Sequence, residues 1–221
     1  MTIALHHEHP WRVSAAEARQ IQERLRSLVA LHGTVEGIRR VAALDVGFRG
    51  ELARAAAVVF TYPELVEAGA AVAERPVEFP YIPGLLSFRE GPAALAALAK
   101  LEAPWDLLLC DGQGYAHPRR FGLACHLGVL LDRPSVGCAK SRLVGTYGEL
   151  GEAAGSWTEL WDGGEVVGAV VRTRAGVKPV YVSVGHRVDL AGAVEIVLGC
   201  TRNRRLPEPL RRAHQLASEE R

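Results

Sequence analysis

The chain has 221 residues, with 26 lysines and arginines against 25 acids and a formal net charge of +1. This length fits one large domain or two small ones, and an apolar share of 48% is ordinary for a globular protein. No apolar run is long enough to span a bilayer, and the chain as a whole is not a polycation, so any nucleic-acid binding requires a local basic patch.

The amino-terminal segment lacks the basic start and the apolar stretch of a secretory signal, so we expect a cytoplasmic protein with no membrane partner. None of the cysteines forms a CxxC pair, which argues against a zinc site. We interpret all four as buried thiols: Cys110, Cys125, Cys138 and Cys200.

The first predicted element is a helix over Ser14–Leu31. Ser14 is a suitable N-cap, and Glu17 completes a capping box three residues later. Three apolar runs follow, and their short connections predict an antiparallel meander. The expected strands are Val41–Phe48, Ala55–Thr61 and Ala70–Glu78.

The second half changes to alternating helices and strands, which predicts parallel pairing through a crossover. The expected elements are a helix over Gly91–Leu101, a strand over Trp105–Cys110, a helix over Phe121–Leu131, a strand over Ser135–Ala139, a hairpin of Glu165–Arg172 and Lys178–Ser183, and helices over Asp189–Leu198 and Pro207–Ala217. No repeat or linker interrupts them, so we expect one domain over residues 1–221. Three antiparallel strands followed by parallel ones, with helices on both faces, are typical of a mixed α/β sheet of the ribonuclease-H-like class.

Three acids stand where strands or helices present them to one edge of this sheet. Asp45 interrupts an apolar strand, Asp111 directly follows another, and Glu90 lies between them at the start of a predicted helix. An ionised carboxylate in such surroundings is costly unless something compensates it. Each acid taken alone is explained by a helix cap or an ion pair. The three together favour a Mg²⁺ site, because Mg²⁺ prefers carboxylates, water and phosphate oxygens.

Basic residues gather in two places. The segment from Asp111 to Gly122 reads DGQGYAHPRRFG, in which His117, Arg119 and Arg120 are suited to phosphate. Lys140, one of only three lysines, follows the next strand. Residues 199–214 hold five arginines against one acid, which indicates either contact with nucleic acid or a solvated helix face: Arg202, Arg204, Arg205, Arg211 and Arg212 against Glu208.

These residues resemble the endonuclease V family, the deoxyinosine 3′ endonucleases. The resemblance rests on five blocks in order, spanning the chain from about residue 10 to its end: Ala42–Val46, Pro80–Gly84 with Ser87–Glu90, Asp111–Gly122, Gly137–Ser141 and Thr201–His214. The resemblance implies a ribonuclease-H-like fold. It also implies an endonuclease that recognises a deaminated purine in DNA and hydrolyses the second phosphodiester bond 3′ to it, leaving 3′-hydroxyl and 5′-phosphate ends.

The resemblance also implies roles for single residues. Asp45 and Asp111 would bind Mg²⁺, or Mn²⁺ as a substitute, with Glu90 as the third acid. Lys140 would stabilise charge on the scissile phosphate, and His214 would lie beside the site. A wedge entering the DNA would comprise Pro80, Tyr81, Ile82 and Pro83. A pocket for the flipped base would comprise Gly84, Leu86, Gly112, His117, Gly122 and Leu123. Phosphate contacts are expected from Arg119, Arg204 and Arg205.

Other readings stay open. The substrate could be inosine-containing RNA, the chain could bind lesions without cleaving them, or it could be another ribonuclease-H-like nuclease. We expect a monomer. Among the remaining histidines we interpret His6, His7 and His9 as a solvated tail and His126 as a core histidine with its hydrogen bonds satisfied.

Overall fold

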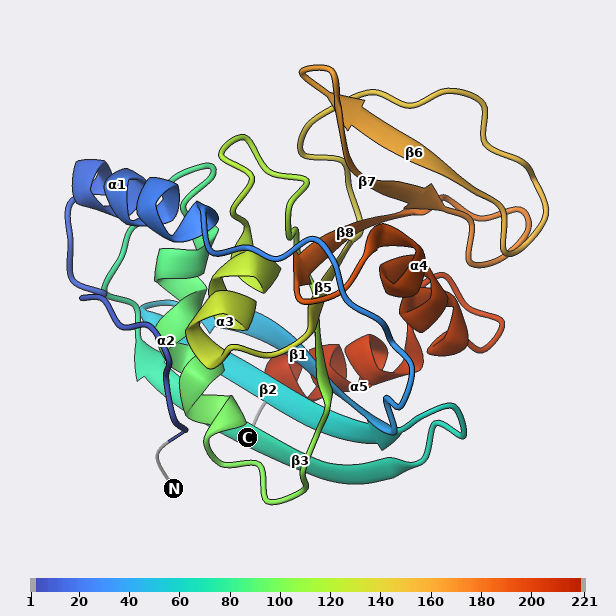
Figure 1. The fold of residues 1–221 in the computed structure, drawn as a ribbon. Coiled ribbons are helices and arrows are strands. Elements are labelled where there is room, and N and C mark those ends of the chain that lie inside the picture. Colours follow the sequence, from blue (N-terminus) through green and yellow to red (C-terminus); the bar gives the residue numbers. More distant parts are fainter. Residues whose placement is uncertain (1–2, 220–221) are drawn as a thin grey trace.

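A mixed sheet of eight strands forms the centre of the protein in the computed structural model, which describes residues 3–219 (Figure 1). The strands are β1 (Arg40–Arg49), β2 (Leu52–Thr61), β3 (Glu67–Pro76), β4 (Leu107–Cys110), β5 (Ser135–Ala139), β6 (Trp157–Asp162), β7 (Glu165–Val171) and β8 (Val180–His186). Their order across the sheet is β3-β2-β1-β4-β5-β8-β7-β6.

The first three strands form the predicted antiparallel meander, in which β2 pairs with both β1 and β3. Side chains along β1 alternate between the two faces of the sheet. Ala42 and Leu44 join one apolar cluster, whereas Val41 and Ala43 join the other. Strand β1 is therefore covered on both sides, which explains its nearly continuous apolar sequence.

Parallel pairing begins where the chain returns beside β1. β4 pairs in parallel with β1 and with β5, and the crossover between β4 and β5 contains α3 (Leu123–Leu131). The predicted parallel pairing of the two strands that flank this helix, β4 and β5, is confirmed. β8 then adds antiparallel to β5, and the predicted late hairpin is confirmed as β7 and β8.

The helices form two layers. α1 (Ala15–Arg26), α2 (Leu86–Leu98) and α3 cover one face of the sheet, and α4 (Leu190–Gly199) and α5 (Glu208–Ser218) cover the other (Figure 1). The capping box of Ser14 and Glu17 is present at the start of α1. The mixed sheet with helices on both faces confirms the predicted ribonuclease-H-like class. All four cysteines are buried free thiols, as expected.

The structure corrects several predicted boundaries, of which two helix boundaries differ most, and adds one strand. α2 begins at Leu86 instead of Gly91 and continues through Pro92, so Glu90 lies inside the helix and not at its start. Pro92 lacks the N–H that would bond to the carbonyl of Phe88, and the side chain of Phe88 is buried in the core. α1 ends at Arg26, before the predicted end. Strand β6 was not predicted, because it is an edge strand that is largely exposed. No helix within residues 3–219 is long and apolar enough to cross a membrane.

Candidate metal centre and base cavity

Two carboxylates meet because two neighbouring strands run in parallel. The register of β1 and β4 pairs Leu44 with Cys110, and the Asp111 N–H donates to the Leu44 carbonyl at 3.0 Å. The next residues along each strand are Asp45 and Asp111. Parallel pairing therefore delivers both side chains to the same edge of the sheet.

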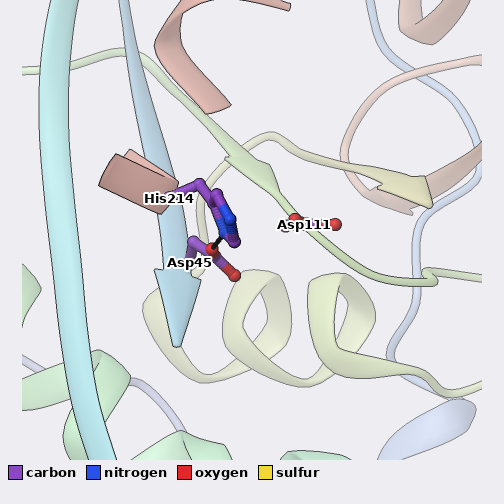
Figure 2. Close-up of side chains that lie close together, drawn as sticks. All are labelled: Asp45, Asp111 and His214. Atoms are coloured by element: carbon purple, nitrogen blue, oxygen red, sulfur yellow. Dashed lines mark hydrogen bonds and ion pairs between the residues drawn. The ribbon is translucent and has the colours of Figure 1, made fainter. Parts of the chain in front are cut away.

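His214 completes this group from helix α5, which packs on one face of the sheet. Its Nδ1 lies 2.7 Å from Oδ2 of Asp45, and ligand atoms of His214, Asp45 and Asp111 all lie within 4.8 Å of one another (Figure 2). Leu210 and Ala213 of α5 are buried in the core between the helix and the sheet, which brings His214 over β1. Figure 2 shows the imidazole and the Asp45 carboxylate pointing toward one another, with Asp111 alongside.

Lys140, directly after β5, adds a positive charge to the group. Its Nζ lies 2.5 Å from Oδ2 of Asp111. Burial raises the pKa of Asp111, with a further contribution from the charge of Asp45, and the ammonium of Lys140 partly offsets this rise. A nearby cation therefore favours the ionised form of Asp111.

Glu90 is a third acid near the same place, but its side chain is more deeply buried. Its side chain is buried on α2, outside the group that lies within 4.8 Å. Burial raises the pKa of Glu90 well above its usual range, and the charges of Asp45 and Asp111 raise it further. The three acids therefore form one interacting set, although only two of them lie in the compact group.

This donor set fits a divalent cation. Asp45 and Asp111 offer carboxylate oxygens within reach of a single ion, and hard cations such as Mg²⁺ prefer oxygen donors. Burial, and to a smaller extent the neighbouring carboxylates, raise the pKa of Asp111 and of Glu90, and a bound cation would favour their ionised forms. Asp45 and Asp111 would hold the ion, with Glu90 as the adjoining acid.

A small, partly open cavity of about 120 Å³ lies beside the segment that follows Asp111. One water molecule needs roughly 10–15 Å³ of such volume, so the cavity has room for a group several times larger. Its lining residues are Gln22, Tyr81, Ile82, Pro83, Gly84, Leu86, Ser87, Gln113, His117, Gly122, Leu123 and Leu143.

The cavity gathers most of the residues predicted for the base pocket. Among these, Gly112 is the one outside its lining. Three predicted wedge residues also line the cavity, whereas Pro80 does not. The side chain of Tyr81 is exposed at 69%, so it is free to contact a partner. The residues predicted for the wedge and those predicted for the pocket therefore adjoin in space as well as in sequence.

The backbone carbonyl of Gly84 is held by three side chains. Gln22 Nε2, His117 Nε2 and Arg119 Nη2 lie 3.1, 3.1 and 2.5 Å from its oxygen. Gly84 has φ +77°, in the left-handed region that favours glycine. Burial lowers the pKa of His117 to about 4, with Arg119 adding to the effect. His117 is therefore neutral near pH 7, which suits a neutral base better than a phosphate.

The predicted phosphate contacts lie in different settings. Arg204 is exposed, with only a long contact to Glu208 at 3.9 Å. The Arg205 guanidinium donates to the backbone carbonyls of Lys140, Lys178 and Pro179, so it also fixes the segment that carries Lys140. The Arg119 guanidinium donates hydrogen bonds at the cavity, to Gln22 Oε1 and to the Gly84 carbonyl. The expectation that Arg120 is free for phosphate is wrong: it is buried and pairs with Asp162 and Glu165.

The amino-terminal histidines require one correction. His6 and His7 are exposed, as expected, but His9 is not part of a solvated tail. Its ring packs on Trp11 and Phe88, and its Nε2 lies 2.6 Å from Nε2 of His126. His126 also bonds to Ser87 Oγ at 2.9 Å, which confirms it as a satisfied core histidine. Aromatic packing outweighs solvation of His9.

Sequence reasoning missed four cavity residues. Gln22 gave a signal, since it is a polar residue on the apolar stripe of α1 between Ala18 and Leu25. The other three gave none, because nothing in their spacing indicates which cavity they line: Ser87, Gln113 and Leu143.

Comparisons with known proteins agree with this geometry. A sequence model of the family described as Endonuclease V matches residues 23–215. Endonuclease V of Roseiflexus castenholzii is 55% identical over 96% of both chains. The crystal structure of Endonuclease V from Streptomyces avermitilis is 45% identical, with a TM-score of 0.90 over 98% of this chain and 96% of that one. Ciona intestinalis Endonuclease V, solved with a DNA containing an inosine followed by a ribo-adenosine, is 28% identical with a TM-score of 0.80, over 93% of this chain and 97% of that one.

Proposed function

The chain belongs to the endonuclease V family, as its motifs indicated, and is a nuclease of that kind. On that premise we propose that it recognises deoxyinosine in DNA and hydrolyses the second phosphodiester bond 3′ to the lesion in a Mg²⁺-dependent reaction. The products would be 3′-hydroxyl and 5′-phosphate ends, and the cell would use the cut in DNA repair. The Ciona relative bound to inosine-containing DNA supports the choice of lesion.

One observation carries the catalytic part of the proposal. Asp45, Asp111 and His214 place two carboxylates and an imidazole within 4.8 Å, and Lys140 contacts the same group. When bound, Mg²⁺ would activate water for attack and neutralise charge on the phosphate. A lesion-binding module without catalysis would have no use for an acidic group of this kind.

The side chains around the acids have separate tasks in this proposal. Lys140 supplies a fixed positive charge beside the place where phosphate charge develops. Its position is defined by the ion pair with Asp111 and by the hydrogen bond from Arg205 to its backbone carbonyl. His214, which is paired with Asp45 and open to solvent, can hold a proton during the reaction.

Base recognition falls to the cavity. We propose that the flipped hypoxanthine enters between Gly84 and the Asp111 turn, with backbone N–H donors of Gly84 and Gly112 directed to its carbonyl oxygen. Flipping a base costs a few kcal/mol, and less for a mispaired one. Tyr81, exposed at the mouth of the cavity, would fill the gap left in the stack.

DNA outside the lesion would be held through phosphate contacts. Arg204 is exposed and nearly unengaged, so it is the strongest candidate on the basic tail. We assign the same role to Arg119 and Arg205. Each guanidinium keeps N–H groups that are not used in hydrogen bonds within the protein. Such contacts are independent of sequence and weaken with salt.

The proposal is tested by mapping a cut. A labelled duplex with a single deoxyinosine is incubated with the protein and Mg²⁺, beside the undamaged duplex and an RNA of the same sequence with inosine. We expect one nick at the second phosphodiester bond 3′ to the lesion and none in the undamaged duplex. A cut only in RNA would make the chain an inosine-specific endoribonuclease, and binding without a cut would make it a lesion sensor.

A further inference from the structure

Two arginines of the antiparallel meander hold the last turn of helix α5. The final carbonyl groups of an α-helix have no partner within the helix. Arg54 of β2 donates from Nε to the Leu216 carbonyl at 3.1 Å. Arg49 of β1 donates from Nη2 to the Ser218 carbonyl at 2.9 Å and also to the carbonyl of Glu219. Both positive charges lie at the end of the helix where the helix dipole favours cations.

Arg54 is the buried member of this pair. Its side chain is 6% exposed, and Nη1 pairs with Glu74 Oε1 of β3 at 2.6 Å. A guanidinium is planar, so a carboxylate at one nitrogen and a carbonyl at another fix its orientation. Arg49 is exposed and lacks such a setting. Arg54 therefore ties the end of α5 to the sheet in one defined place.

The strand beside Arg54 receives the same turn of the helix. The register of β1 and β2 places Gly47 opposite Arg54. A Cβ at Gly47 would lie 3.1 Å from the carbonyl oxygen of Ala217, so the backbone of α5 approaches β1 closely at this point. Gly47 and Arg54 thus contact consecutive carbonyls of one helical turn, those of Ala217 and Leu216.

This turn adjoins the metal centre. Asp45 is two residues before Gly47 on β1, so both positions face the same side of the sheet. His214 is two residues before Leu216 on α5, and its Nδ1 lies 2.7 Å from Asp45 Oδ2. The side chain of His214 is 57% exposed, so it has little packing of its own. Its place beside Asp45 follows from the helix that carries it.

We propose that Arg54 is a positioning residue for cleavage, which holds the end of α5 so that the His214 imidazole stays at the Asp45 carboxylate. This inference rests on the proposed function, in which His214 holds a proton during the reaction. Without Arg54 the last turn is released from β2, and the imidazole spends less time at Asp45. A misplacement of about 1 Å at a reacting group can cost about 10²-fold in rate.

The proposed role is confined to the cleavage step. Leu210 and Ala213 keep the rest of α5 packed in the core, so the helix remains on the sheet when Arg54 is replaced. Arg54 is also absent from the lining of the base cavity. Binding of the lesion should therefore not depend on it.

The first test makes Arg54→Met in two backgrounds, wild type and His214→Ala. Methionine keeps much of the side-chain length but donates no hydrogen bond. The single-turnover cleavage rate of a deoxyinosine duplex should fall about 10-fold in wild type and less than about 2-fold in His214→Ala, because Arg54 acts through His214. The Kd of the same duplex, measured in EDTA, should change less than about 2-fold in both backgrounds.

Arg54→Lys keeps the charge and a donor, so its rate should lie between those of wild type and Arg54→Met. It takes the place of Arg54→Met in the same cycle if the methionine variant does not fold. Arg187→Met is the matched control, because Arg187 pairs with Asp132, the C-cap of α3, away from the acids. It should change the rate by one common factor in both backgrounds.

Three outcomes of this cycle would overturn the role of Arg54. They are an equal loss of rate in both backgrounds, an unchanged rate in the wild-type background, and a weakening of Kd large enough to account for the loss of rate. The first would mean that Arg54 acts independently of His214, and the last would make it a contact for DNA binding.

The second test does not depend on cleavage. The ring ¹⁵N chemical shifts of His214, assigned by their absence in His214→Ala, are measured in EDTA at about pH 8, where a free imidazole is neutral. Arg54→Met should move them toward the values of a solvated histidine, and unchanged shifts would overturn the proposal. If the wild-type chain does not cut the deoxyinosine duplex, the proposed function fails, and these shifts alone decide whether Arg54 positions His214.

Discussion

Two histidines of this protein make short hydrogen bonds in opposite surroundings. His214 meets Asp45 at 2.7 Å with a side chain that is 57% exposed. His126 meets His9 at 2.6 Å and is fully buried among aromatic rings. Bond length does not separate them, but access to water and to charge does. The first region is open to water and to a charged partner, and the second is closed to both.

The buried region has a consistent set of donors. His9 Nδ1 lies 2.9 Å from the Pro10 carbonyl, so it carries the hydrogen and His9 Nε2 accepts. His126 Nε2 then donates to His9, and its Nδ1 accepts from the Ser87 hydroxyl. Every member is neutral in this chain. A second proton on His9 would set two N–H groups against each other.

The largest effect should come from the region around His214, which includes Asp111. Asp111→Asn should lower the cleavage rate on the order of 10³-fold with little change in thermal unfolding, because an amide is a poor ligand for Mg²⁺ and Lys140 loses its ion partner. Asp132→Asn is the control, since Asp132 pairs with Arg187 away from the acids and should keep the rate within about threefold. Equal losses in the two variants would contradict a metal role for Asp111.

The buried region should respond in stability instead. His126→Ala should lower the free energy of unfolding by about 2–4 kcal/mol, because it opens a cavity and leaves Ser87 Oγ and His9 Nε2 without a partner. Urea unfolding measures this change. His214→Ala should cost less than about 0.5 kcal/mol, since its side chain is mostly exposed. Similar losses for both would remove the distinction between the two regions.

The same contrast holds for two aromatic residues. Tyr81→Ala should weaken binding of a base-paired deoxyinosine about 10-fold, and a single-stranded one less, without a change in Tm, because Tyr81 is exposed and stacking is worth roughly 1–3 kcal/mol. Trp11→Ala, which removes a ring from the His9 cluster, should lower Tm and leave the ratio of the two substrates unchanged. A Tyr81 variant with lowered Tm and an unchanged ratio would refute the wedge.

The smallest effect is a pH dependence of stability. Burial lowers the pKa of His9, with Arg24 contributing, and lowers that of His126 well below its usual range, with His9 contributing. The unfolded chain binds these protons near pH 6.5, so stability is complete above that pH and falls as the pH drops below it.

His9→Phe should therefore flatten the dependence of unfolding free energy on pH between about 7 and 5, relative to wild type. His6→Phe, at an exposed position, should leave that dependence as it is. Urea titrations at several pH values provide the comparison. An unchanged slope in the His9 variant would show that the pair does not stay neutral in the folded state.

The amino-acid sequence by itself predicted seven of the eight strands in their order along the chain. The apolar runs around Asp45 and before Asp111 predicted β1 and β4, and the crossover helix predicted the parallel pair of β4 and β5. The parallel pairing of β1 with β4, which brings the two carboxylates together, was decided by the tertiary structure. The edge strand β6 was missed, since an exposed strand lacks the apolar pattern that marks a buried one.

Only the tertiary structure decided which distant side chains pair. His214 reaches Asp45 across 169 positions, and His9 reaches His126 across 117. Packing of α5 and of the amino-terminal segment sets these contacts, and nothing in local spacing encodes them. The contact between Arg54 and the Leu216 carbonyl is of the same kind, because it spans 162 positions. Backbone preference and apolar period are local, whereas hydrogen-bond satisfaction is decided by the whole fold.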